Sequence, residues 1–164
     1  MPQKTPQRPN PPISRKQGGR LKVSFTVFGK PIPQGSMRAF TPKGWKRPIL
    51  TSANPALKSW RQELVTAARE AVFQSTEVGF PIKAGIPVRA TLRFFFAAPK
   101  REKGGIKATR PDADKLLRSC LDGMSGVVYC DDAQVAHAEI FKLFGIPERV
   151  EIEVSECETN GKLF

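Results

Sequence analysis

The stretch PDADKLLRSCLDGMSGVVYCDDAQVAHAEIFKLF, residues 111–144, sets the expected fold because it reads as a helix, a turn and a strand in succession. Residues 112–124 place apolar side chains at helical spacing, with charged side chains on the other face. Residues 127–130 have the composition of a short strand, residues 131–132 predict a turn, and residues 133–144 predict a longer strand. A helix enclosed between strands indicates a mixed α/β arrangement.

Patterns outside this stretch predict the remaining elements. Apolar residues alternate with polar ones over residues 21–28 and 149–154, and residues 87–97 are β-branched and aromatic, so each stretch predicts a strand. The basic stretch 38–47 resembles a hairpin. Asn54 followed by Pro55 predicts the start of a helix whose apolar face continues to Val72.

The length and composition predict one domain preceded by an arm. Residues 1–20 are rich in Pro, Gln, Arg and Gly and lack apolar periodicity, which predicts a flexible, disordered basic arm. The rest of the 164-residue chain, 21–164, is long enough for one compact domain. We expect an α/β (α+β) fold with a mixed sheet of about four to five strands flanked by two main helices.

Charge and cysteine content restrict the classes of function. Lys and Arg outnumber Asp and Glu by 27 to 15, which gives a net charge of +12 and indicates a polyanionic partner. The three cysteines are widely spaced and there is a single histidine, a pattern that favours neither a zinc site nor a disulfide framework. No apolar run is long enough to span a bilayer. We therefore expect a cytoplasmic protein, in a bacterium or in the host of a phage, without membrane contact.

Two acidic pairs stand out in this basic chain: Asp112 with Asp114 at a helix start, and Asp131 with Asp132 in the turn. If a helix and its return bring the pairs side by side, three or four carboxylates repel one another, and a hard divalent cation such as Mg²⁺ offsets that repulsion. An alternative interpretation is structural, because Asp commonly caps helices and occupies turns.

The residues of three motifs resemble the signatures of a known family. PDADKLLRSCLDG at 111–123 and VVYCDDAQV at 127–135 resemble the P-D-x-D-N-L-x-K and D-D-A-Q-V signatures of the RusA resolvases, and GKPIPQG at 29–35 is similar to the family's first turn. The resemblance extends from about residue 21 to 156. It implies a Mg²⁺-dependent endodeoxyribonuclease, with Mn²⁺ able to substitute, that resolves Holliday junctions by paired symmetric nicks in DNA recombination and repair.

Transferred residue by residue, the resemblance implies that Asp112, Asp114 and Asp132 are catalytic and bind the metal, with Asp131 as a neighbouring ligand. Arg118 stands where the family usually has a lysine, and Lys115 where it commonly has an asparagine. Both departures keep a cation beside the acids. A guanidinium, however, donates a proton less readily than an ammonium.

The resemblance also implies a homodimer on four-way junction DNA, without a nucleotide cofactor. The candidate phosphate-binding residues share a positive charge near the motifs; they are Arg38, Lys46, Arg47, Lys100, Arg101, Lys103, Lys107, Arg110 and Lys115. Met37, Phe40 and Trp45 lie among these charges. They are predicted either to stack at the centre of the junction or to pack in the core. Two alternatives remain open: a DNA-binding module without catalysis, and a metal nuclease that cuts flaps or RNA–DNA hybrids.

Overall fold

The computed structural model describes residues 20–35, 37–52, 54–101 and 105–157. The basic arm predicted at residues 1–20 therefore lies outside the described residues, apart from Arg20. The elements in chain order are β1 (Lys22–Phe28), β2 (Met37–Phe40), β3 (Ile49–Ser52), α1 (Ala56–Gln74), β4 (Val88–Phe96), β5 (Gly105–Ile106), α2 (Ala113–Met124), η1 (Asp132–Gln134), β6 (Val135–Phe144) and β7 (Arg149–Glu156).

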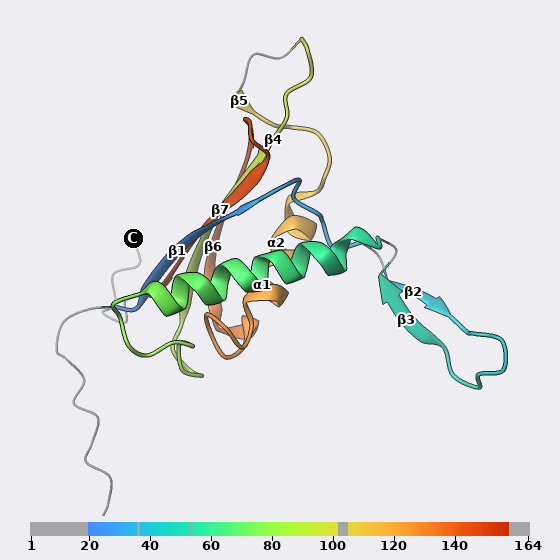
Figure 1. Cartoon of the computed structure of the whole chain (residues 1–164), viewed down its shortest axis with the longest axis horizontal. Coiled ribbons are helices and arrows are strands. Elements are labelled where there is room, and N and C mark those ends of the chain that lie inside the picture. The colour runs from blue at the N-terminus through green and yellow to red at the C-terminus, as the bar shows by residue number, and fades with distance from the viewer. Residues whose placement is uncertain (1–19, 36, 53, 102–104, 158–164) are drawn as a thin grey trace, which may run out of the picture.

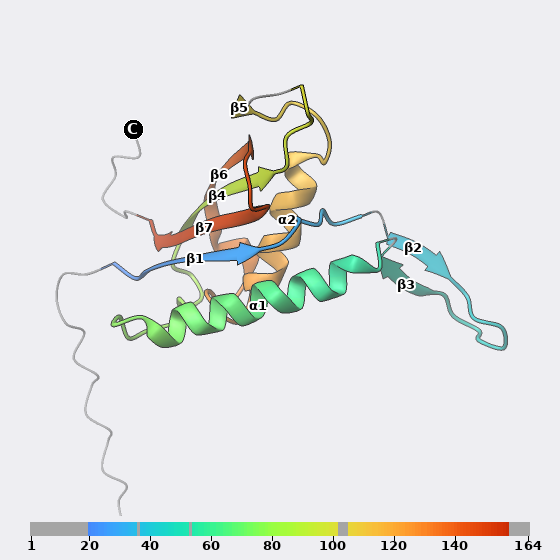
Figure 2. The ribbon, with the colours of Figure 1, turned by 45° about the horizontal axis from the view of Figure 1, so that its top comes forward.

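Five of the strands form one mixed sheet in the order β1-β7-β4-β6-β5 (Figures 1 and 2). The central strands β4 and β6 run parallel, whereas the pairings of β7 with β1 and β4, and of β5 with β6, are antiparallel. The sheet and the two helices confirm the predicted α+β fold. The hairpin of β2 and β3 forms a second, two-stranded sheet, and both views show it projecting beyond the start of α1.

The core lies between one face of the sheet and both helices. In the register of the sheet, Ile152 of β7 is paired with Phe25 of β1 and with Leu92 of β4, so these side chains share a face. They belong to the same apolar cluster as Leu64 of α1 and Leu116 of α2. Burial of each large apolar side chain contributes about 1.5–3 kcal/mol, and the helices are held to the sheet by this packing.

The two helices also approach each other closely. A Cβ atom added to Gly123 of α2 would lie 2.8 Å from Leu64 Cδ2, closer than side chains pack. A salt bridge joins Arg61 of α1 to Asp122 of α2 at 2.6 Å. Glycine at position 123 therefore permits the helix contact that fixes α2 on the sheet. Within the described part of the chain, neither helix is long and apolar enough to cross a membrane.

Three local predictions need correction. Residues 127–130 form a turn with single bridges from Tyr129 to Ile82 and Ser125, not a strand, because the amides of Val127 and Val128 bond back to Met124. Residues 133–134, predicted to begin the longer strand, belong to the 3₁₀ helix η1, and β6 begins at Val135. The predicted loop from Lys100 to Arg110 contains the short strand β5 at the sheet edge.

The two ends of the parallel pair β4 and β6 are marked by side-chain hydrogen bonds. Near the end of β6, Lys142 Nζ donates to the carbonyl oxygens of Thr109 (2.8 Å) and Pro111 (2.9 Å). Just before β6, Gln134 Nε2 donates to the carbonyl oxygens of Lys83 (2.7 Å) and Ile86 (3.0 Å), which precede β4. The residues before α2 and those before β6 therefore lie at opposite ends of the central strands.

Candidate active site

The first acidic pair stands at the start of α2, at the end of the sheet marked by Lys142. Asp112 precedes the helix, Asp114 lies in its first turn, and both side chains are exposed. Asp112 Oδ2 forms a salt bridge of 3.1 Å with Lys115 Nζ. The hydrogen bond and charge of Lys115 lower the pKa of Asp112, and Arg110 and Lys142 add smaller contributions in the same direction. Asp112 therefore remains an anion well below neutral pH.

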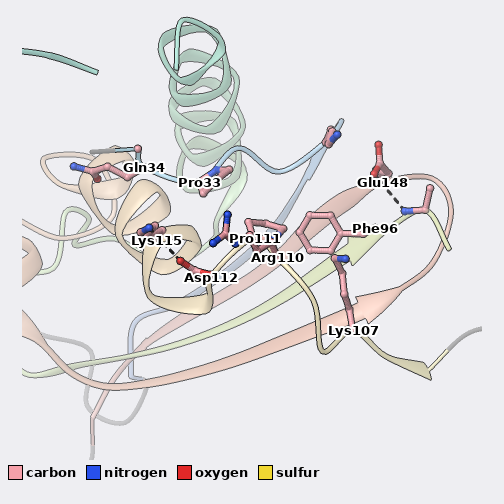
Figure 3. Close-up of a pocket in the computed structure, with 12 residues that line it drawn as sticks. Pro33, Gln34, Phe96, Lys107, Arg110, Pro111, Asp112, Lys115 and Glu148 are labelled. Atoms are coloured by element: carbon pink, nitrogen blue, oxygen red, sulfur yellow. Dashed lines mark hydrogen bonds and ion pairs between the residues drawn. The ribbon is translucent and has the colours of Figure 1, made fainter. Parts of the chain in front are cut away.

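Asp112 lines a cleft of about 550 Å³ between the turn after β1 and the segment before α2. Figure 3 shows Lys115 and Asp112 pointing toward each other, with Arg110 and Phe96 along the same wall. The cations around the cleft are Lys30, Lys107, Arg110 and Lys115, against the two acids Asp112 and Glu148. A cleft with this excess of positive charge favours the phosphate groups of a nucleic acid.

The turn at residues 29–35 is attached to both helices. Arg61 Nη2 of α1 donates to Gln34 Oε1 (2.8 Å) and to Asp122 Oδ2 of α2 (2.6 Å). The amide of Gln34 donates to the carbonyl oxygen of Lys115 in α2 (2.9 Å). These bonds hold one wall of the cleft against the first turns of α2, where the first acidic pair lies.

The second acidic pair has a different local structure. Asp131 caps η1: its Oδ1 accepts from the amide of Ala133 (2.8 Å), and its own amide donates to Gln134 Oε1 (3.0 Å). The same Gln134 side chain is bonded to carbonyl oxygens before β4. The capping interaction fixes the backbone of this pair, while both carboxylates remain exposed.

Buried Tyr129 links the second pair to the later turns of α2. Its hydroxyl donates to the carbonyl oxygen of Leu121 at 2.9 Å. Burial raises the pKa of Tyr129, and the nearby charge of Asp132 raises it further. Asp132 therefore lies beside the turn that follows α2 rather than beside its start, and Tyr129 is a neutral donor at physiological pH.

The structure of the chain does not bring the two acidic pairs together. The helix between them has 12 residues, a length of roughly 18 Å. Among the described residues, no group of three or more His, Cys, Asp and Glu side chains is placed to hold a metal ion. The expected assembly of three or four carboxylates is therefore not formed by a single copy of the chain.

Arg118 lies one helical turn after Asp114, and both are exposed on α2. Cys120 belongs to the core, and burial raises the pKa of its thiol to about 12. It is therefore not a nucleophile. His137 lies on β6 in contact with Glu139, away from both acidic pairs.

The predicted phosphate-binding residues fall into three places. Lys107, Arg110 and Lys115 line the cleft. Lys46 and Arg47 are exposed in the hairpin connection between β2 and β3, and Lys100 and Arg101 are exposed after β4. Arg38 is on β2, and its side chain, like that of Met37 and the whole of Lys103, lies outside the described structure.

The two described aromatic candidates lie on or beside this hairpin. The exposed fractions of Phe40 and Trp45 are 60% and 62%, which excludes packing in the core of the protomer.

Sequence reasoning missed several residues of this site. Lys30 and Gln34 belong to the turn at residues 29–35, whose sequence showed only a resemblance to the family's first turn. The position of this turn at the cleft depends on the contact of Gln34 with Arg61. Lys142 lies near the end of β6, ten residues after Asp132 in the sequence. In the structure it supports the backbone immediately before Asp112. The period-two pattern of β6 alone gives no sign of that contact.

Comparisons with known proteins agree with the fold and with the motifs. The YqaN protein of Bacillus subtilis (strain 168) is 24% identical over 140 residues, which cover 82% of this chain and 96% of YqaN. A protein of Lactococcus phage r1t named crossover junction endodeoxyribonuclease RusA is 32% identical over 73 residues, 43% of this chain and 56% of the phage protein. Residues 29–155 match the family described as endodeoxyribonuclease RusA. That match covers most of the chain, and this protein therefore belongs to the RusA family of endodeoxyribonucleases.

Proposed function

We propose that this chain resolves four-way (Holliday) junctions by paired symmetric nicks, as a homodimer, in DNA recombination and repair. The basic cleft around Asp112, in a chain of the RusA family, carries the proposal. The name of the phage relative supports a junction as the substrate. A junction has approximate twofold symmetry and requires two cuts, which suits a homodimer with one site for each cut.

In this proposal the reaction is hydrolysis of a phosphodiester bond that leaves 5′-phosphate and 3′-hydroxyl ends. Asp112, Asp114 and Asp132 are the catalytic acids, Asp131 is their neighbour, and a divalent cation, Mg²⁺ or Mn²⁺, supplies Lewis-acid activation when bound. Within one copy of the chain Asp132 lies apart from Asp112 and Asp114, so the described residues of a single copy do not form a complete metal site. Arg118 supplies a fixed positive charge beside Asp114 for the reacting phosphate.

The cations of the cleft position the DNA strand. Lys30 lies in the turn after β1, and Lys107 and Arg110 lie in the connection between β5 and α2, so a strand entering the cleft meets positive charge from both segments. The Lys107 ammonium lies 5.6 Å and 5.3 Å from the ring centres of Phe96 and Phe144, and these cation–π contacts orient its side chain. The exposed cations of the β2–β3 hairpin extend the positive surface.

The direct test is cleavage of an end-labelled synthetic four-way junction, with flap, RNA–DNA hybrid and duplex substrates of matched sequence. Paired nicks at symmetric positions in the junction, present with Mg²⁺ and absent with EDTA, are the expected result. Preferential cutting of the flap or the hybrid would replace the proposal with a different nuclease. Tight junction binding, unaffected by EDTA and without any cut, would indicate a binding module.

The cleft is tested by Lys107→Met, which removes the ammonium while keeping an apolar stem against the two phenylalanine rings. Loss of one phosphate contact is expected to lower the slope of log K against log salt by about 0.9 and to weaken binding several-fold. Lys58→Met, on the exposed face of α1, is the matched control and is expected to bind as the wild type does. Equal binding by both variants would exclude Lys107 from the DNA interface.

A further inference from the structure

The proposed function leaves the aromatic side chains of the β2–β3 hairpin without a role. Both legs of this hairpin are attached beside the cleft. Gly35 lines the cleft, and β2 begins two residues later at Met37. After β3, the amide of Ala56 donates to Asn54 Oδ1 (3.0 Å) at the start of α1. Figures 1 and 2 show the hairpin projecting away from the sheet and the helices, so it extends outward from one wall of the cleft.

Two large aromatic side chains of the hairpin are exposed to solvent. More than half of the surface of Phe40 and of Trp45 is exposed, and neither residue belongs to the apolar cluster of the core. Ile49, also exposed, is paired with Phe40 across the hairpin, so these two side chains share a face. Large apolar side chains that gather on one exposed segment are typical of a surface that binds a ligand.

A tight turn closes the tip that carries Trp45. The amide of Trp45 donates to the carbonyl oxygen of Pro42 (3.0 Å), and Gly44 between them has a φ of +93°. A positive φ at the third residue of such a turn is typical of type II, which favours glycine there. The backbone beside the indole is therefore held by its own hydrogen bond, which lowers the entropic cost of binding at the tip.

The hairpin is also strongly basic. Residues 36–52 contain no Asp or Glu and four cations: Arg38, Lys43, Lys46 and Arg47. Aromatic rings among positive charges suit nucleic acid with unstacked bases, because the cations contact phosphates while the rings stack on the bases. The like charge of a second copy of the hairpin opposes pairing of two hairpins. The charge therefore favours a nucleic acid over another copy of this chain as the ligand.

We propose that the β2–β3 hairpin binds nucleobases that have a free face, with Phe40 and Trp45 as the stacking side chains. This inference rests on the proposed function and specifies how a junction is distinguished from a duplex. Inside a duplex both faces of each base are covered by neighbouring bases, whereas a base at a branch point loses a neighbour on one side. The cleft around Asp112 contacts phosphates, which every DNA shares, so the hairpin supplies the preference for branched DNA.

Intrinsic fluorescence tests the stacking, because the chain has two tryptophans, of which Trp45 is exposed and Trp60 is buried in the core. The probes are oligothymidylate and an abasic strand of equal length, which carries the same phosphates without bases. Both are titrated in EDTA so that no cleavage occurs. Oligothymidylate is expected to quench the emission of Trp45, and the abasic strand is expected to leave it unchanged.

The variants Trp45→Ala and Phe40→Ala each remove one ring. Each is expected to weaken binding of oligothymidylate and of a four-way junction by about 5- to 150-fold, the usual effect of losing one stacked base. Binding of the abasic strand and of duplex DNA is expected to stay unchanged, as is the slope of log K against log salt, because no phosphate contact is lost. Phe73→Ala removes an exposed ring from α1 and is the matched control, which is expected to bind every probe as the wild type does.

Wild-type affinity for oligothymidylate in both hairpin variants, or equal quenching by the abasic strand, would overturn the proposal. A blue shift of Trp45 emission with vesicles of anionic phospholipid, without any response to oligothymidylate, would assign the hairpin to a lipid surface instead. If the wild type cuts no junction but loses affinity for oligothymidylate on either substitution, the proposed function fails and the base-binding hairpin stands. If the hairpin variants bind and cut the junction as the wild type does, the proposed function stands and the hairpin has no part in it.

Discussion

The two ends of α2 carry acidic pairs that look alike in the sequence and differ in the structure. At the first end, Asp112 lies in a basic cleft and pairs with Lys115. At the second end, Asp131 caps η1 and Gln134 fixes the backbone, while the charge of Asp132 raises the pKa of buried Tyr129. An ion pair therefore holds the acidic side chain at the first end, whereas hydrogen bonds hold the backbone at the second end. The difference is consistent with the proposal that the first end contacts DNA and that the second presents a carboxylate on a backbone fixed by hydrogen bonds.

The largest effect is expected from Asp114→Asn, which removes a carboxylate while keeping the size of the side chain. Junction cleavage is expected to fall by roughly 10²- to 10³-fold or more, because the remaining acids hold a cation poorly. Binding to the junction should be unchanged or slightly stronger. The measurements are single-turnover cleavage and a binding titration, with Glu70→Gln on the exposed face of α1 as the control. Full activity of the Asp114 variant would remove this residue from the site.

An intermediate effect is expected from Gln134→Ala at the second end. The substitution leaves the carbonyl oxygens of Lys83 and Ile86 and the amide of Asp131 without their partner, at an expected loss of about 1–3 kcal/mol in the free energy of unfolding. Urea unfolding measures this loss, with exposed Gln62→Ala as the matched control.

Cleavage by the folded Gln134 variant is also expected to fall, because Asp132 loses its fixed backbone. Wild-type cleavage in a destabilised Gln134→Ala protein would show that the position of Asp132 has no part in the reaction.

The smallest effect is expected from Lys115→Met at the first end. The partner that lowers the pKa of Asp112 is lost, so this pKa is expected to rise toward its ordinary value. The ion pair contributes above the ordinary pKa of the carboxyl group and is lost as the pH falls through the lowered pKa. Stability at neutral pH should change little, because both groups are exposed. Carboxyl NMR titration gives the measurement, and an unchanged Asp112 pKa would refute the pairing in solution.

Most of the fold follows from local patterns. The alternation in β1 and β7 and the helical spacing in α1 and α2 identify the residues of the core, because each element buries one face. Tyr129 shows where local reasoning fails: an apolar run looks like a strand, but the chain is in a tight turn whose amides bond back to the end of α2. The parallel pairing of β4 with β6 joins segments far apart in the chain, and no local pattern predicts it.

The candidate site could be predicted only in part, for the same reason. The Asp-x-Asp sequence before a helix gives the first acidic pair and its basic neighbours, which are local features. The distance between the two acidic pairs depends on the direction in which the chain runs after α2, through η1 and along β6. The bonds of Lys142 to Thr109 and Pro111 at one end and of Gln134 at the other determine that direction. The same long-range contacts bring Lys30 and Gln34 into the cleft.

The proposal that this protein makes two coordinated cuts in a four-way junction is tested most directly with a supercoiled plasmid that extrudes a cruciform. With Mg²⁺ present, we expect linear DNA cut at the base of the cruciform, because paired nicks across a junction linearise the circle. The same plasmid without the inverted repeat should remain supercoiled. Equal cutting of both plasmids, or only nicked circles from the cruciform plasmid, would contradict the claim.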